Sequence, residues 1–162
     1  MAGVLEALVA RAALDSEPVA VEMSPGWWIR PIVGPVEARV GDPQLQSFLS
    51  LTESTLRRLE SVSQQSAVAY VHLEYHGGTG FQGAAVWDAG SLVFGPVFTS
   101  NHPSELVTAE YELVREPSRV GELAINRALR HLGAVAADGL DEFATVGLDR
   151  HRWNDDWLAD RA

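Results

Sequence analysis

The chain lacks both cysteine and lysine, and each absence excludes a class of chemistry. Without cysteine there is no disulfide framework, no thiolate nucleophile and no cysteine-ligated zinc. Every one of the 12 basic residues is arginine, so no mechanism can use a lysine amine. The absence of cysteine suits the reducing cytoplasm, which is where we expect the protein to reside.

Long hydrophobic runs are also missing. No run approaches the roughly 18 apolar residues that a membrane span requires. Residues 3–14 carry apolar side chains at helical spacing, but Glu6 and Arg11 interrupt them and no basic segment precedes them. We therefore predict a short amphipathic helix there, and not a signal peptide. A length of 162 residues with an apolar fraction of 46% indicates a single domain over residues 1–162.

Positive charge is scarce. Asp and Glu total 22 against 12 basic residues, which gives a formal net charge of −10. Such a surface repels nucleic acid and anionic membranes and attracts basic proteins. We therefore expect no nucleic acid and no membrane partner, and favour a basic protein partner. The alternative is that the charge only keeps the protein in solution.

Short β-type runs begin after the N-terminal segment. Residues 19–23 and 27–33 flank a Pro25-Gly26 turn signal, which predicts a hairpin. Pro31 cannot donate a hydrogen bond to a neighbouring strand, so we expect its strand to lie at the edge of a sheet.

A β-meander is predicted next, with strands at residues 67–76, 81–88 and 91–98. Residues 105–116 form either a fourth strand or a helix. The whole pattern predicts an α+β fold, in which an antiparallel meander sheet of about four to six strands carries two or three helices, mainly on one face.

Two helices have clear start signals. Asp42 is a natural N-cap followed by a proline, and apolar residues then recur at steps of three and four, which predicts a helix of roughly 20 residues. Ser118 is the expected cap of a second helix, which Gly133 ends. Its predicted buried side consists of Ile125, Ala128, Leu129 and Leu132. We expect the charged and aromatic C-terminal tail to pack on the domain.

The glycines of "GTGFQG" match the G-x-G-x-x-G pattern of nucleotide-binding loops through Gly78, Gly80 and Gly83. A dinucleotide site needs a helix after these glycines, whereas β-forming residues follow here. The kinase and Walker A versions need a lysine, which the chain lacks. We therefore predict a hairpin turn without a nucleotide, and a Gly83 that lets another group pack closely.

Alternation along the first meander strand separates two faces. Val71, Leu73 and Tyr75 share the aliphatic face, which should carry the helices. The opposite face is aromatic and polar, and a four-residue turn would place Phe81 across from His76. The candidate binding residues on that face are Tyr70, His72, Glu74, His76, Phe81 and Trp87. If exposed, they resemble a protein-binding surface; alternatively, the hairpin with Trp27 and Trp28 covers them.

Enzymatic and metal chemistry is the alternative use of this face, through His72, Glu74 and His76. The two histidines lie about 13 Å apart along the strand at roughly 3.3 Å per residue, too far to share one zinc ion. We therefore predict no metal and no cofactor, and lean towards a protein that is not an enzyme. Asp141 or Glu142 with His151 could form a catalytic dyad only if the fold joins them.

Two segments carry a family resemblance. The stretch "YVHLEYHGGTGFQGAAVW" resembles E-Y-x-G-G-x-G-x-Q-x-A-x-x-W sequences in small bacterial proteins, and "INRALRHLG…GLDEFATVGLDRHRWNDDW" resembles the ending found alongside them. The pairing resembles immunity-type proteins of bacterial polymorphic-toxin systems and their uncharacterised relatives, over roughly the last 95 residues. The resemblance implies an acidic intracellular α+β protein that binds and neutralises a toxin domain without catalysis. It assigns no functional residue.

Overall fold

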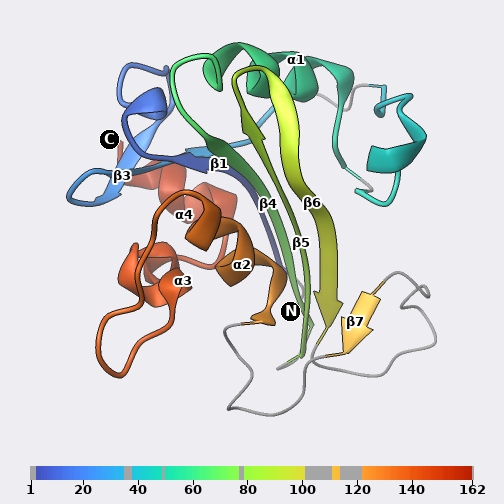
Figure 1. The fold of residues 1–162 in the computed structure, drawn as a ribbon. Helices are drawn as coiled ribbons and strands as arrows, with labels where there is room; N and C mark the ends of the chain where they lie inside the picture. Colours follow the sequence, from blue (N-terminus) through green and yellow to red (C-terminus); the bar gives the residue numbers. More distant parts are fainter. Residues whose placement is uncertain are drawn as a thin grey trace.

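A seven-stranded sheet organises the computed structural model, which describes residues 3–34, 38–48, 50–76, 79–100, 111–113 and 122–161. The strand order is β2-β3-β1-β4-β5-β6-β7 (Figure 1). The strands are β1 (Gly3–Ala10), β2 (Val21–Ser24), β3 (Trp27–Pro31), β4 (Val68–His76), β5 (Thr79–Asp88), β6 (Ser91–Ser100) and β7 (Tyr111–Leu113). The first six are antiparallel to their neighbours, and β7 pairs in parallel with β6. The predicted α+β class is confirmed.

The N-terminal segment is a strand, so the helix predicted for residues 3–14 is wrong. β1 lies between β3 and β4 near the middle of the sheet. Leu5 and Val9 enter the core on one face of the sheet, whereas Leu8 enters the core on the other. A strand that is buried on both faces reads as a nearly continuous apolar run, which periodicity does not distinguish from a helix.

The predicted hairpin is confirmed as β2 and β3, but the edge position of Pro31 is wrong. β3 lies between β2 and β1, and Pro31 is its last residue. The Ile32 amide donates to the Glu6 carbonyl, so the nitrogen of Pro31 points to the β2 side. The pairing of β2 with β3 begins at Ile29, opposite Val21. Proline is tolerated because β2 does not extend to its position.

The meander is confirmed, but its register differs from the predicted one. Phe81 pairs with Glu74 and not with His76, because His76 pairs with Thr79. A shift of two residues leaves every side chain on its predicted face. A regular second turn would place Phe94 on the aromatic face with Trp87. Irregular pairing of β5 with β6 instead places Phe94 opposite Val86, on the aliphatic face, so that prediction is wrong.

The predicted long helix after Asp42 is divided in two. Asp42 caps only the 3-10 helix η2 (Pro43–Leu45), through a bond from the Gln44 amide of 2.9 Å. Thr52 caps the following helix, α1 (Glu53–Val62). Of residues 105–116, the described residues 111–113 form β7, and the rest lie outside the description.

The second predicted helix is α2 (Ala124–His131), and its predicted buried side is confirmed. Ser118, its expected cap, lies outside the described residues. The sheet caps α2 instead, because the amides of Ala124 and Ile125 donate to the side chains of Thr99 and Gln82. Gly133 follows α2 with φ +92°, as predicted for its C′ position.

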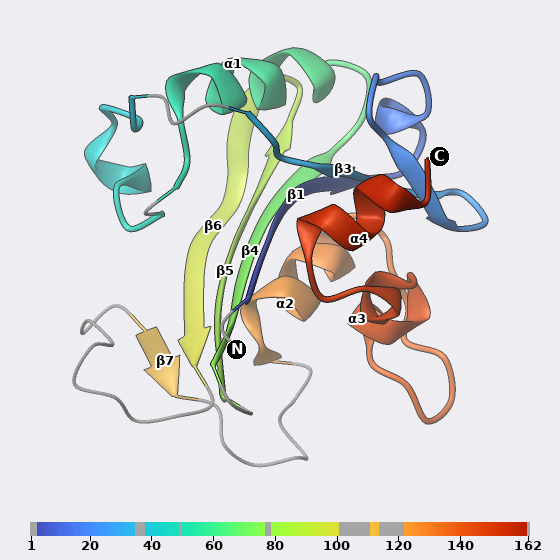
Figure 2. The same ribbon diagram turned by 180° about the vertical axis from the view of Figure 1, so that it is seen from behind.

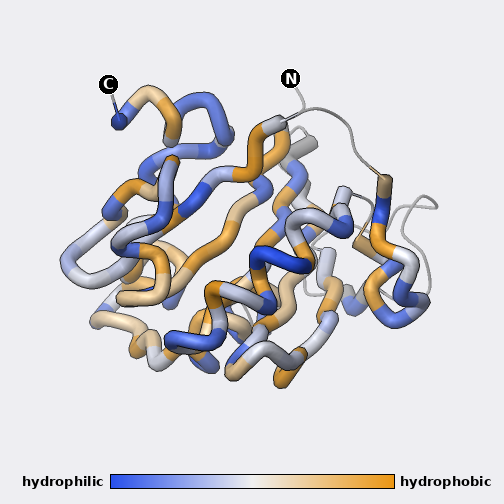
Figure 3. Tube along the Cα trace, turned by 90° about the horizontal axis from the view of Figure 1, so that it is seen from above, coloured by the Kyte–Doolittle hydropathy of each residue, from blue (hydrophilic) through white to orange (hydrophobic). Residues whose placement is uncertain are grey.

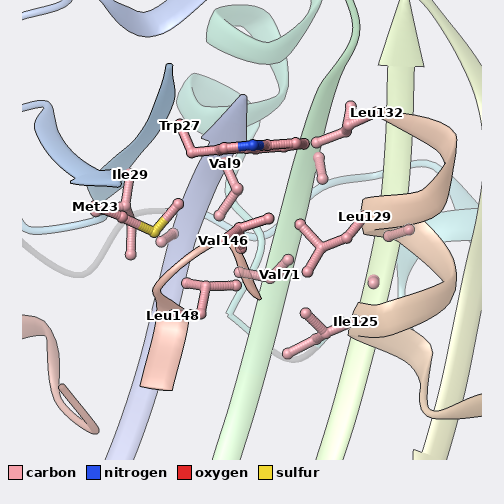
Figure 4. Packing of buried hydrophobic residues seen from close by; sticks show 14 of the residues in the cluster. Val9, Met23, Trp27, Ile29, Val71, Ile125, Leu129, Leu132, Val146 and Leu148 are labelled. Carbon is pink, nitrogen blue, oxygen red and sulfur yellow. The ribbon is translucent and has the colours of Figure 1, made fainter. Parts of the chain in front are cut away.

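Two cores cover the two faces of the sheet. The aliphatic face packs against α2, α3 (Glu142–Thr145), η4 (Leu148–Arg150) and α4 (Asn154–Ala159), which confirms that the C-terminal tail packs on the domain. Figure 4 shows part of this core, where Leu129 of α2 and Leu148 of η4 lie near Val71. The other face packs against α1, the short helix η1 (Ala12–Leu14) and the segment around η2 (Figure 2). Most of the helices therefore lie on the aliphatic face, as predicted.

Candidate functional site

The aromatic strand face is an interior surface. Tyr70 and Trp87 are 0% and 2% exposed, so the prediction that they anchor a partner is wrong. Their cover comes from residues 40–62, which the predicted long helix did not place over this face. Phe48 contacts the ring of Tyr70 edge-on, with 4.9 Å between centroids. The predicted alternative cover, the Trp27–Trp28 hairpin, instead extends the sheet.

A polar cluster remains on this face, where Glu6 of β1 pairs in register with His72 of β4. The Tyr70 hydroxyl donates to Glu6 Oε1 at 2.6 Å, and His72 Nε2 lies 3.0 Å from Glu74 Oε1. Glu6 was not among the predicted site residues, because a helix was predicted for residues 3–14. The signal available was that Glu6 interrupts an apolar run.

Burial controls the electrostatics of this cluster. It raises the pKa of Glu6 above its usual range, against the hydrogen bond from Tyr70 and the nearby His72, which both lower it. Burial also raises the pKa of Tyr70 well above its ordinary value, and the Glu6 carboxylate raises it further. Tyr70 therefore stays protonated and acts as the donor. Nδ1 of His72 is buried without a hydrogen-bond partner.

The predicted enzyme residues are brought together only in part. His72 and Glu74 form a pair, but His72 is buried, so a substrate would reach Glu74 first. The side chain of His76 lies outside the described residues, and Phe81 is half-buried. Within the described ranges, no group of three or more His, Asp or Glu side chains is arranged to hold a metal ion.

The glycine pattern lies in a hairpin, as predicted. Gly80 and Gly83 belong to β5, which follows β4 directly, whereas Gly78 lies outside the described residues. A Cβ on Gly83 would lie 2.8 Å from Phe48 Cε1 and 2.9 Å from Phe98 Cε1. This position therefore serves close packing of two phenyl rings, which confirms the packing role predicted for Gly83.

The hypothetical dyad of His151 with Asp141 or Glu142 is wrong. His151 Nε2 lies 3.0 Å from Asp160 Oδ2. Glu142 accepts from Arg130 at 2.9 Å, and Asp141 caps α3 through the amide of Ala144. These side chains hold the C-terminal helices together and leave no acid–base pair between them.

The strongest candidate surface is the loop between α2 and α3, residues 134–141, hereafter the α2–α3 loop. Val135 and Leu140 are 80% and 52% exposed, and Asp138 between them is exposed as well. The loop projects away from the sheet (Figure 1, Figure 2). Exposed apolar side chains bordered by polar ones are a feature of protein-binding surfaces.

Hydrogen bonds fix the conformation of this loop. The Ala137 amide donates to Thr145 Oγ1 at 3.0 Å, and the Leu140 amide donates to the Ala137 carbonyl at 3.0 Å. Asp141 closes the loop by accepting from Asn126 Nδ2 at 3.1 Å. Its exposed apolar side chains are therefore presented on an ordered backbone, which lowers the entropic cost of binding.

Acidic side chains continue along the rest of the C-terminal segment. Asp149, Asp155, Asp156 and Asp160 are all exposed. Near the C-terminus, hydrophilic stretches lie on either side of a short apolar one (Figure 3). Trp157 is fully buried, whereas the aspartates of this segment face outward.

Comparisons with protein-family models, with curated proteins and with solved structures found no match to this chain. Within the described residues, no helix combines the length and apolar character needed to cross a membrane.

Proposed function

We propose that this protein is a non-enzymatic interaction protein that binds a basic protein partner through its C-terminal segment, residues 135–160. The exposure of Val135 and Leu140 on the hydrogen-bonded α2–α3 loop is the observation that carries the proposal. Because water-exposed apolar side chains lose contact with water on binding, they supply affinity.

Charge supports a basic partner. The chain has a formal net charge of −10, and exposed aspartates follow the loop. Long-range attraction raises the association rate of an oppositely charged partner, whereas the desolvated centre of the contact contributes most of the binding energy. The resemblance to immunity-type proteins is consistent with a basic protein partner. It suggests a toxin domain, neutralised by direct binding, as that partner.

A basic protein encoded beside this gene is the partner to test. Binding is measured by surface interferometry for the wild type, Val135→Ala, Leu140→Ala and the control Val93→Ala, which truncates a valine of similar exposure, 54%, on β6. Each loop variant should weaken binding by about 1–2 kcal/mol, and the control should not. The association rate should fall with salt, which screens charge beyond about 8 Å at physiological strength.

Some results would reject only the proposed binding surface, and others would reject the proposed function. Unchanged affinity in both folded loop variants would reject the α2–α3 loop as the interface. An association rate that is independent of salt would reject electrostatic steering by the acidic surface. Hydrolysis or transfer activity that depends on His72 would instead favour the enzyme alternative.

A further inference from the structure

The surface beside α2 gathers basic side chains. Phe94 of β6 and three residues of α2, Arg127, Arg130 and His131, line an open hollow of about 300 Å³. This volume is at the lower end of the range for small-molecule sites, roughly 300–1,000 Å³. Two arginines and a histidine are gathered here in a chain whose net charge is −10. A carboxylate lies beside each arginine, Glu142 beside Arg130 and Glu112 beside Arg127, so the hollow attracts an anion through guanidinium N–H donors and not through a net positive charge.

Phe94 provides an apolar surface within this hollow. The guanidinium carbon of Arg127 lies 5.8 Å from the centre of the Phe94 ring. The His131 ring lies 4.2 Å from it, centroid to centroid, with 32° between the planes. Arg127 and His131 are four positions apart on α2 and therefore share one side of the helix. Two planar polar groups are thus held against one aromatic ring.

Neighbouring carboxylates occupy only part of the donor capacity of the arginines. Arg130 Nη1 lies 2.9 Å from Glu142 Oε1, and Arg127 Nη1 lies 3.5 Å from Glu112 Oε2. A guanidinium has several N–H donors in a planar fork, so one contact does not exhaust it. The Arg127 pair is long and at the surface, and such a pair contributes little stability. An incoming anion can therefore replace it at small cost.

We propose that this hollow binds a small planar anion of the aromatic carboxylate class. A carboxylate matches the planar fork of Arg127 and Arg130, which favours bidentate hydrogen bonding. The aromatic part of the ligand packs on the exposed ring of His131, which lies against Phe94, where a hydrated spherical anion gains nothing. The site is separate from the α2–α3 loop, so it does not depend on the proposed protein interaction.

The test is a titration of ¹⁵N-labelled protein with sodium benzoate, followed by amide chemical shifts. Benzoate should saturate α2 and β6 resonances with a dissociation constant of roughly 1 mM, as expected for a ligand of this size. Two probes test the two features of the ligand. Benzamide, the neutral isostere, lacks the negative charge, and inorganic phosphate lacks the aromatic ring. Each should bind at least about tenfold more weakly than benzoate.

The matched variants are Arg127→Gln and Arg57→Gln, the second on α1, which covers the opposite face of the sheet. Arg127→Gln should weaken benzoate binding about tenfold or more while the protein stays folded by thermal unfolding, and Arg57→Gln should bind like the wild type. Equal binding of benzoate and benzamide, equal losses in the two variants, or shifts that do not saturate would each overturn the proposal.

Discussion

Replacing Tyr70 by Phe deletes a single oxygen and leaves the half-buried carboxyl group of Glu6 without this donor. The Tyr70 hydroxyl lies 2.6 Å from Glu6 Oε1, and the tyrosine is completely buried. The ring stays in place, so the loss of packing is small. A hydrogen bond to a charged group contributes about 1.5–3 kcal/mol, and one between neutral groups about 1 kcal/mol. We expect Tyr70→Phe to lower the free energy of unfolding by about 2 kcal/mol when Glu6 is ionised.

The pH dependence of the Tyr70→Phe penalty tests whether the lost hydrogen bond to Glu6 causes it. Because burial raises the pKa of Glu6 above 4.5, the folded protein binds this proton more tightly than the unfolded chain does. The stability that Glu6 contributes is therefore greatest below pH 4.5 and declines as pH rises through its folded-state pKa. The bond from Tyr70 opposes this decline, since it favours the carboxylate. Tyr70→Phe should therefore destabilise the protein more at about pH 8 than at about pH 4.

Urea unfolding followed by tryptophan fluorescence measures these differences. At about pH 8 a loss of 2 kcal/mol lowers the melting temperature by roughly 4–8 °C for a chain of this size. The control is the same substitution in a Glu6→Gln background, where the penalty should lose its pH dependence because the side chain no longer titrates. A Tyr70→Phe penalty below about 0.5 kcal/mol, or one equal at the two pH values, would refute the role assigned to this hydrogen bond.

Two further substitutions test the packing of the sheet. Gly83→Ala places a methyl group 2.8 Å from a ring carbon of Phe48, and such overpacking should cost about 1–3 kcal/mol in urea unfolding. An unchanged midpoint would mean that the ring moves aside freely. Asn154→Ala removes the side-chain oxygen that accepts from the Glu6 amide at 3.0 Å, at a cost of about 1–2 kcal/mol. Hydrogen exchange at the Glu6 amide should accelerate in this variant and not in the exposed control Asp155→Ala. Equal exchange rates in both variants would show that the Asn154 side chain does not protect this amide.

Local patterns in the sequence were sufficient for much of the fold. Alternating β-formers between turn signals predicted the three meander strands and the hairpin of β2 and β3. The buried side of α2 and its terminating Gly133 were predicted from helical spacing and positive-φ preference. These features depend on residues that are close in sequence, so their physical causes are present in any short segment.

The candidate site was less predictable from the sequence. Tyr70 and Trp87 were placed on the correct face, but their exposure depends on whether another segment covers that face. The cover begins near Asp42, where an expected continuous helix divides into η2 and α1. The exposure of Val135 and Leu140 on the α2–α3 loop is likewise a property of the folded chain.

The sequence by itself therefore determined which segments form alternating strands, where turns occur and which residues end a helix. It also determined the acidic character of the protein. The tertiary structure alone decided that residues 3–10 form a central strand, because burial on both faces outweighs a weak local helical preference. It also decided where α2 begins, through caps that Thr99 and Gln82 supply from distant strands. Burial and long-range hydrogen bonds are properties of the assembled chain, and no single segment contains them.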